Sequence, residues 1–84
     1  MDIWTFFVDY QGELYEIQID KNKTFSEFRR KTSEITNVPF NDLVLLAGVE
    51  YNRDFNSKII GEINTLGNGT TFYLVVKIMG GNWQ

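Results

Sequence analysis

The stretch TFSEFRRKTSEITNVP, residues 24–39, decides the fold because it predicts one amphipathic helix in a chain that otherwise favours strands. Thr24 followed three residues later by Glu27 is a capping box, in which each side chain satisfies a free backbone N–H of the first turn. The closing Asn-Val-Pro stops the helix, because Asn can adopt the left-handed conformation and Pro blocks continuation. We therefore predict a helix over residues 25–36. Its mostly apolar stripe, at helical spacing, consists of Phe25, Phe28, Thr32 and Ile35.

Two strand-forming segments precede this helix. DIWTFFV (2–8) and ELYEIQI (13–19) are rich in β-branched and aromatic residues, and the turn between them contains Gly12. This pattern predicts an antiparallel hairpin. In the second strand the apolar residues alternate with Glu and Gln, so we expect its odd-numbered face to be buried. That face carries Tyr15, Ile17 and Ile19.

Two further strands follow the helix. DLVLLAG (42–48) is too apolar for alternation alone to assign its faces, and TFYLVVKI (71–78) predicts a last strand. Between them the signals are weak, and they indicate a short strand near Glu50 and Tyr51 and a short helix over residues 57–63. Elements in this order predict an α+β domain in which the helix covers one face of a mixed sheet.

The composition excludes several classes of function. The 84 residues include no cysteine and no histidine, which removes disulfides, thiolate nucleophiles, Cys/His zinc sites and Ser-His-Asp arrangements. The carboxylates are scattered, so we predict that the protein is not an enzyme, with no catalytic residues, no metal site and no cofactor. The net charge of −3 argues against a nucleic-acid or membrane partner. We expect the basic run FRRK (28–31) to form a solvated helix face.

The order of these elements and the residues in them resemble the ubiquitin-like β-grasp family over nearly the whole chain. The resemblance rests on the Val-Pro step in NVPFNDLVLLAG (37–48), on the Ala-Gly that ends this segment, and on a last strand in TTFYLVVKIMGG (70–81) that runs into Gly-Gly. It implies one β-grasp domain over residues 1–79 and a tail over residues 80–84. It also implies that the first and last strands form a parallel central pair.

The chain departs from ubiquitin itself at several lysine positions. Val49 and Asn68 stand where ubiquitin has two of its lysines, whereas Lys31 aligns with a ubiquitin lysine on the helix. Lys77 replaces the arginine that precedes the family's tail. The resemblance therefore implies a divergent ubiquitin-like modifier.

The Gly-Gly after the last strand gives this resemblance its functional content. It implies that the Gly81 carboxylate, which follows Gly80, is activated and joined to target amines once Asn82–Gln84 is removed. The partners would be activating, conjugating and processing enzymes, together with ubiquitin-type binding domains. Two alternatives stay open: a β-grasp sulfur carrier that uses a Gly81 thiocarboxylate, and an interaction module that is never conjugated. We expect a monomer in the cytoplasm, with the nucleus as a second location.

Strand alternation predicts a surface for non-covalent binding. With Val44 and Leu46 toward the core, Leu43 and Leu45 would point outward. With Phe72, Leu74 and Val76 toward the core, Tyr73, Val75 and Lys77 would point outward. Leu45 and Val75 match two members of the apolar patch through which ubiquitin is recognised, and Tyr10 would stand in for the third. An exposed apolar patch on a small domain usually marks a partner site. The predicted partner-binding residues are Leu43, Leu45, Tyr73, Val75, Lys77 and Tyr10.

The first strand offers a second candidate patch. Ile3, Thr5 and Phe7 share one of its faces, and Trp4 and Phe6 share the other. We expect the two aromatic residues of the second face to form a separate patch, unless a dimer contact or the C-terminal residues cover them.

Overall fold

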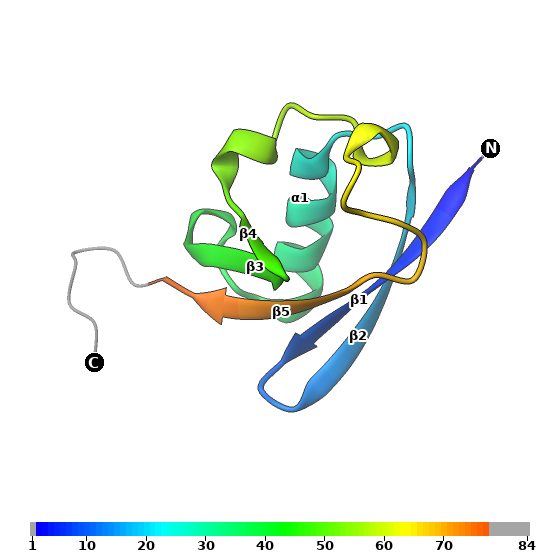
Figure 1. Cartoon of the computed structure of the whole chain (residues 1–84). Helices are drawn as coiled ribbons and strands as arrows, with labels where there is room; N and C mark the ends of the chain where they lie inside the picture. The colour runs from blue at the N-terminus through cyan, green and yellow to red at the C-terminus, as the bar shows by residue number, and fades with distance from the viewer. Residues whose placement is uncertain (1, 78–84) are drawn as a thin grey trace.

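A computed structural model describes residues 2–77 as a five-stranded mixed sheet with one α-helix on one of its faces (Figure 1). The strands are β1 (Ile3–Tyr10), β2 (Glu13–Asp20), β3 (Leu43–Ala47), β4 (Val49–Tyr51) and β5 (Thr71–Val76). The connections contain the helix α1 (Phe25–Thr36) and the short 3-10 helices η1 (Phe40–Asp42), η2 (Arg53–Phe55) and η3 (Ile60–Glu62). The predicted α+β order is confirmed.

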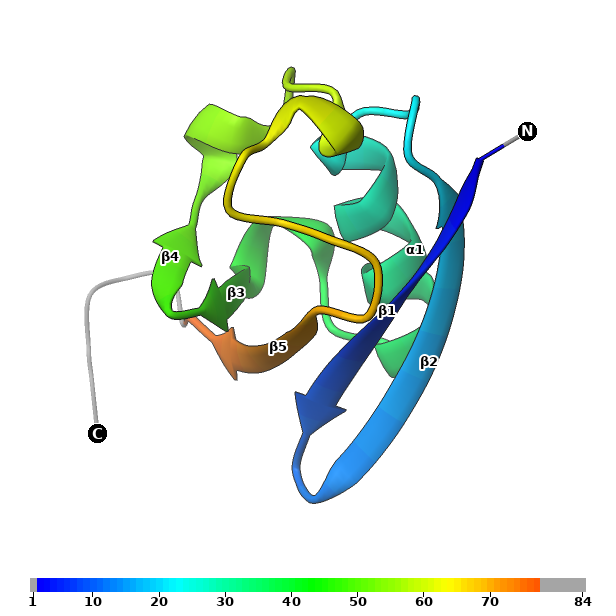
Figure 2. The ribbon, with the colours of Figure 1, turned by 45° about the vertical axis from the view of Figure 1, so that its right-hand side comes forward.

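The sheet has the order β2-β1-β5-β3-β4, so the first and last strands are neighbours in its interior. These two strands run parallel, with Phe7 opposite Thr71, as the resemblance implied. All other neighbouring strands are antiparallel. The β1–β2 hairpin turns through Gln11 and Gly12, which both have positive φ (51° and 82°), the combination that a type I′ turn requires. Figure 2 shows the turn of this hairpin projecting beyond the other strands.

Helix α1 has the predicted bounds, and the predicted residues hold both of its ends. Thr24 is the N-cap, and its hydroxyl accepts a hydrogen bond from the backbone N–H of Glu27 at 3.4 Å. Asn37 closes the C-terminus in the left-handed conformation, with φ of 63°, and its N–H donates to the carbonyl of Ser33 at 2.9 Å. Local side-chain chemistry therefore sets the length of this helix.

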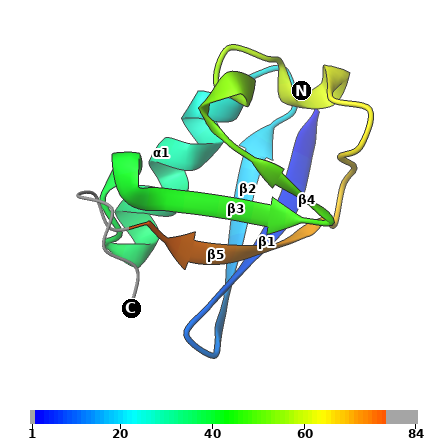
Figure 3. The same cartoon turned by 60° about the vertical axis from the view of Figure 1, so that its left-hand side comes forward.

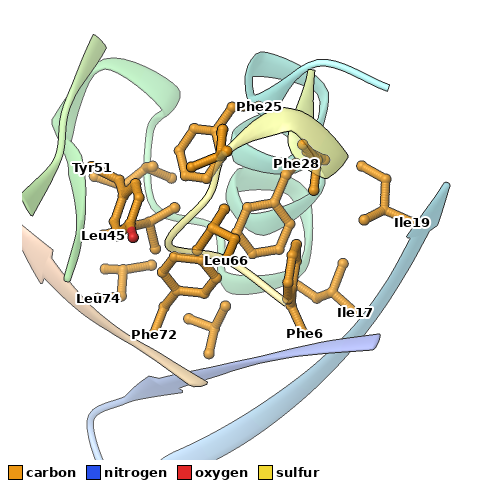
Figure 4. Packing of buried hydrophobic residues seen from close by; sticks show 14 of the residues in the cluster. Phe6, Ile17, Ile19, Phe25, Phe28, Leu45, Tyr51, Leu66, Phe72 and Leu74 are labelled. Carbon is orange, nitrogen blue, oxygen red and sulfur yellow. The ribbon is translucent and has the colours of Figure 1, made fainter. Parts of the chain in front are cut away.

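A cluster of aromatic side chains joins the helix to the sheet (Figure 4). The ring centroid of Phe72 lies 5.1 Å from that of Phe28, 5.4 Å from Phe6 and 5.6 Å from Tyr51, in tilted or edge-on geometry. Such pairs contribute about 0.5–1.5 kcal/mol each beyond the area they bury. Phe25 and Phe28 are fully buried, which confirms the prediction for the helix stripe. The aliphatic side chains around the rings include Ile17, Ile19, Leu45, Leu66 and Leu74.

Two residues of the helix differ from the prediction. Ile35 is 47% exposed, because it lies in the last turn over an open groove between α1 and β2. Arg29 is only 5% exposed, so the basic run does not form a solvated face throughout. Arg29 follows Phe25 by four residues, and this spacing places both side chains on the same side of the helix.

The segment between β4 and β5 is held by backbone partners that are distant in sequence. The short strand predicted near residues 50–51 is confirmed as β4. The short helix predicted over residues 57–63 is reduced to the single 3-10 turn η3. The N–H of Ile60 donates to the carbonyl of Lys23 at 2.9 Å, which fixes this turn beside the start of α1. Local sequence signals are weak here because these tertiary bonds determine the path.

Candidate protein-binding surface

Strand β3 faces the opposite way from the prediction. Leu43 and Leu45 point into the core, with exposed fractions of 2% and 0%. Leu45 is directly opposite Leu74 of β5, whose side chain is buried, and residues opposite each other in a sheet lie on the same face. The predicted outward orientation of Leu43 and Leu45 is therefore wrong. Val44 and Leu46 take the outer face instead, and both are partly exposed.

The outward residues of β5 agree with the prediction. Tyr73 and Val75 are 60% and 40% exposed, whereas Phe72 and Leu74, which alternate with them, are buried. Lys77 is exposed just beyond the end of the strand, and its backbone N–H bonds to a carbonyl of η1 at 2.6 Å. The outward orientation of Tyr73 and Val75 and the exposure of Lys77 are confirmed, and the role of these residues in binding stays a prediction.

Four apolar side chains of β3 and β5 lie together on the face of the sheet opposite α1. Val44 is directly opposite Val75, and Leu46 is directly opposite Tyr73. Figure 3 shows the two strands side by side. Residues opposite each other in an antiparallel pair have Cβ atoms about 4.5–5.5 Å apart, so the four side chains form one continuous surface. We call Val44, Leu46, Tyr73 and Val75 the outer sheet patch.

Carboxylates border this patch along the direction that crosses the strands. Asp9 of β1 is opposite Tyr73, and Glu50 of β4 is opposite Leu46. Leu14 of β2, which is 62% exposed, is opposite Asp9 and extends the same row to the edge of the sheet. The arrangement suits a partner with an apolar centre and basic groups at its rim.

The other predicted surface residues do not join the outer sheet patch. Tyr10 is half-buried and packs against the core, because it shares a face of β1 with the buried residues Phe6 and Val8. Phe6 is fully buried, so the predicted second patch is wrong for this residue. Trp4 is half-buried, with its ring centroid 6.1 Å from that of Phe6 and 5.8 Å from Nζ of Lys21.

The predicted conjugation residues, Gly80 and Gly81, and the segment Asn82–Gln84 lie outside the described residues. Strand β5 ends at Val76, and Lys77 is the last residue that the structure describes. Within residues 2–77 no three acidic side chains gather where they could hold a metal ion. No helix in the same range is long and apolar enough to cross a membrane.

No protein-family model matches the chain, and no curated protein matches its sequence. Solved structures do match its architecture. The ubiquitin-like domain of an Arabidopsis thaliana protein gives a TM-score of 0.77 at 15% identity, over 100% of this chain and 87% of that one. Ubiquitin of Caldiarchaeum subterraneum gives 0.74 at 17% identity, over 94% and 99%. The fold is a ubiquitin-like β-grasp.

This β-grasp also matches part of a longer chain. ATBAG1, solved in complex with HSP70, gives a TM-score of 0.75 at 17% identity, over 90% of this chain and 41% of that one. Similar folds therefore occur both as nearly whole chains and as domains of longer ones. Identities this low establish the architecture alone.

Proposed function

We propose that this β-grasp domain is a ubiquitin-like modifier, which partner proteins bind through the outer sheet patch and which enzymes attach to target amines through Gly81. The observation that carries the proposal is the exposure of Tyr73 and Val75 on the strand that leads to the Gly-Gly. Strand β5 thus carries apolar residues for recognition, and the Gly-Gly for conjugation follows it in the sequence. The protein would act as a ligand and a substrate, and the catalytic residues would belong to its enzymes.

Tyr73 supports the non-covalent half of this proposal. Its side chain is 60% exposed, and a tyrosine provides a large contact area at a low cost in conformational entropy. Tyrosine is also enriched among the few residues that carry most of the binding energy at interfaces. The neighbouring apolar side chains of the patch can exclude water around it, while Asp9 and Glu50 supply a polar rim.

The covalent half requires a free carboxylate at Gly81. Hydrolysis of the peptide bond between Gly81 and Asn82 provides it. The carboxylate then attacks the α-phosphorus of ATP and releases pyrophosphate. An enzyme thiolate displaces AMP to form a thioester, and a target amine then displaces the thiolate to form an amide. Glycine supports this chemistry because the absence of a Cβ leaves its carbonyl open to attack.

Two other functions fit the same fold. A sulfur carrier would end at Gly81 with a thiocarboxylate, and an interaction module would use the outer sheet patch without any reaction at the tail. The three functions differ in the chemical form of the C-terminus, so mass spectrometry separates them. In the sequence only residues 77–79 separate the end of β5 from Gly80, and this spacing favours the modifier over the interaction module.

A truncated chain tests the covalent half. Residues 1–81 are supplied with ATP to a lysate of the protein's own cells, and the products are separated by mass. We expect higher-mass adducts that survive reduction by thiols and that do not form without ATP. The matched control is the same truncated chain with Gly81→Ala, whose added methyl group should reduce adduct formation. If residues 1–81 yield no adduct, thioester or thiocarboxylate, the interaction module becomes the better assignment.

A pair of charge substitutions tests the non-covalent half. Purified ubiquitin-type binding domains are titrated into the chain and into its Val75→Asp and Ile35→Asp variants. Both residues are exposed, but Ile35 lies on α1 and not on the sheet face that carries the patch. Val75→Asp should weaken binding by more than about tenfold, because it introduces a charge into the apolar contact. Equal losses in the two variants would exclude the outer sheet patch as the binding surface.

A further inference from the structure

Arg29 is buried on the inner side of α1 with most of its hydrogen-bonding capacity unused. Its Nη2 donates to the carbonyls of Phe40 at 3.2 Å and Leu43 at 3.1 Å. Nε and Nη1 are buried as well, and neither has a hydrogen-bond partner among residues 2–77. A buried guanidinium with unpaired N–H groups is costly, and native proteins rarely leave such a group without a reason.

A second arginine, Arg53, lies close enough to Arg29 to affect its charge. Burial lowers the pKa of the Arg29 guanidinium, and the positive charge of Arg53 lowers this pKa further. The ring of Phe40 lies 5.1 Å from Cζ of Arg29 and 5.5 Å from Cζ of Arg30, so its face is shared by two cations. The guanidinium groups of Arg29 and Arg53 thus lie close together beside α1. A buried cation at such a position would usually be paired with a carboxylate.

A cavity of about 390 Å³ lies where these groups meet. Its walls come from α1, η1 and the turn after β4, which lies beside α1 in Figure 1. Arg53 and Asn41 are exposed at the cavity, whereas Oδ1 of Asn56 is buried and, like Nε and Nη1 of Arg29, has no partner among residues 2–77. The cavity is lined by Arg29, Phe40, Asn41, Arg53 and Asn56.

A smaller cavity of about 80 Å³ adjoins the first along the two arginines. Glu50 is the acidic residue that lines it, and Lys77 adds a third cation beside Arg29 and Arg53. The three cations outnumber the single carboxylate, so this region is positive although the whole chain has a net charge of −3. A local positive site on an acidic protein attracts anions without making the surface generally basic.

We propose that this cavity binds a phosphate group, with Arg53 and Asn41 contacting its oxygens and Arg29 providing charge from below. Two guanidinium groups match the charge of a phosphate group, which is about −1.5 to −2 at neutral pH. Guanidinium donors also suit phosphate oxygens geometrically, and the bonds are strengthened by both charges. The fixed position of Nη2, held by two backbone carbonyls, means that Arg29 loses little freedom when the anion enters.

The test is an NMR titration of the full chain with inorganic phosphate, against sodium chloride at the same ionic strength. The Nε–H signal of Arg29 and the side-chain amide signals of Asn41 and Asn56 report on the cavity. We expect saturable shifts of these signals with phosphate and none with chloride. Arg53→Gln should weaken phosphate binding by about tenfold or more, because a hydrogen bond to a charged group is lost.

The matched control is Arg30→Gln, which makes the same change in charge one residue after Arg29 but does not line the cavity. Both substitutions are at exposed residues, so both variants should fold. A phosphoserine peptide in place of inorganic phosphate distinguishes a phosphorylated protein from free phosphate as the source. The proposal is overturned if the shifts do not saturate, if Arg30→Gln weakens binding as much as Arg53→Gln, or if succinate binds as tightly as phosphate.

Discussion

Replacing Leu45 with alanine tests the orientation of β3, on which the outer sheet patch depends. Leu45 is fully buried and lies opposite Leu74 in the core. Leu→Ala at such a site costs about 2–5 kcal/mol, because it loses the transfer free energy of the side chain and leaves a cavity. The next residue, Leu46, lies half-exposed on the outer face, so Leu46→Ala should cost about 1 kcal/mol or less.

Thermal unfolding followed by circular dichroism measures this difference. For a domain of this size, 1 kcal/mol shifts the melting temperature by about 4–8 °C, so Leu45→Ala should lower it by more than about 8 °C. Leu46→Ala is the matched control, since it removes the same atoms from the adjacent residue. If Leu46→Ala destabilises the protein as much as Leu45→Ala or more, β3 faces the other way and the patch is wrongly composed.

Three further predictions concern the helix ends and the hairpin. Thr24→Ala should reduce the free energy of unfolding by about 1 kcal/mol in urea denaturation, and Thr24→Ser should not, because the capping hydroxyl is retained. Asn37→Gly should be more stable than Asn37→Ala by about 1 kcal/mol, because only glycine adopts positive φ freely, and equal stabilities would argue against the left-handed C-cap. Burial, and then the carboxylate of Glu13, raise the pKa of Tyr15 above its usual value. Glu13→Gln should therefore lower the pKa of Tyr15 in a 13C NMR titration. Because the pKa of Tyr15 is higher in the folded chain than in the unfolded chain, the stability linked to its protonated form is present below about pH 10 and is lost at higher pH.

The parts of the fold that the sequence predicted well are those determined by local chemistry. The bounds of α1 follow from the Thr24 cap and the Asn37 to Pro39 stop, and both ends are as predicted. In β5 the prediction placed Phe72 and Leu74 toward the core; both are buried, so Tyr73 and Val75 point outward as expected. Half of the outer sheet patch was thus predictable before the structure was known.

The parts that the sequence did not predict depend on contacts between distant segments. Residues 43–47 are all apolar, so alternation cannot choose a face, and the register with β5 makes the choice. The burial of Arg29 had a local signal, since it follows Phe25 by four residues, but the basic character of the run argued for solvent. The cavity beside Arg29 was not predictable, because Arg53 and Asn56 reach it only through the folding of the segment after β4.

Mass spectrometry of a tryptic digest of the protein's own cells tests the proposed function most directly. Trypsin cleaves after Lys77, so a conjugated chain leaves the remnant Ile-Met-Gly-Gly, residues 78–81, on lysines of target proteins. We predict that this remnant is found as an amide on such lysines and that a free peptide ending at Gly81 accompanies it. Detection only of peptides that continue through Asn82 to Gln84, with no remnant on any lysine, would contradict conjugation through Gly81.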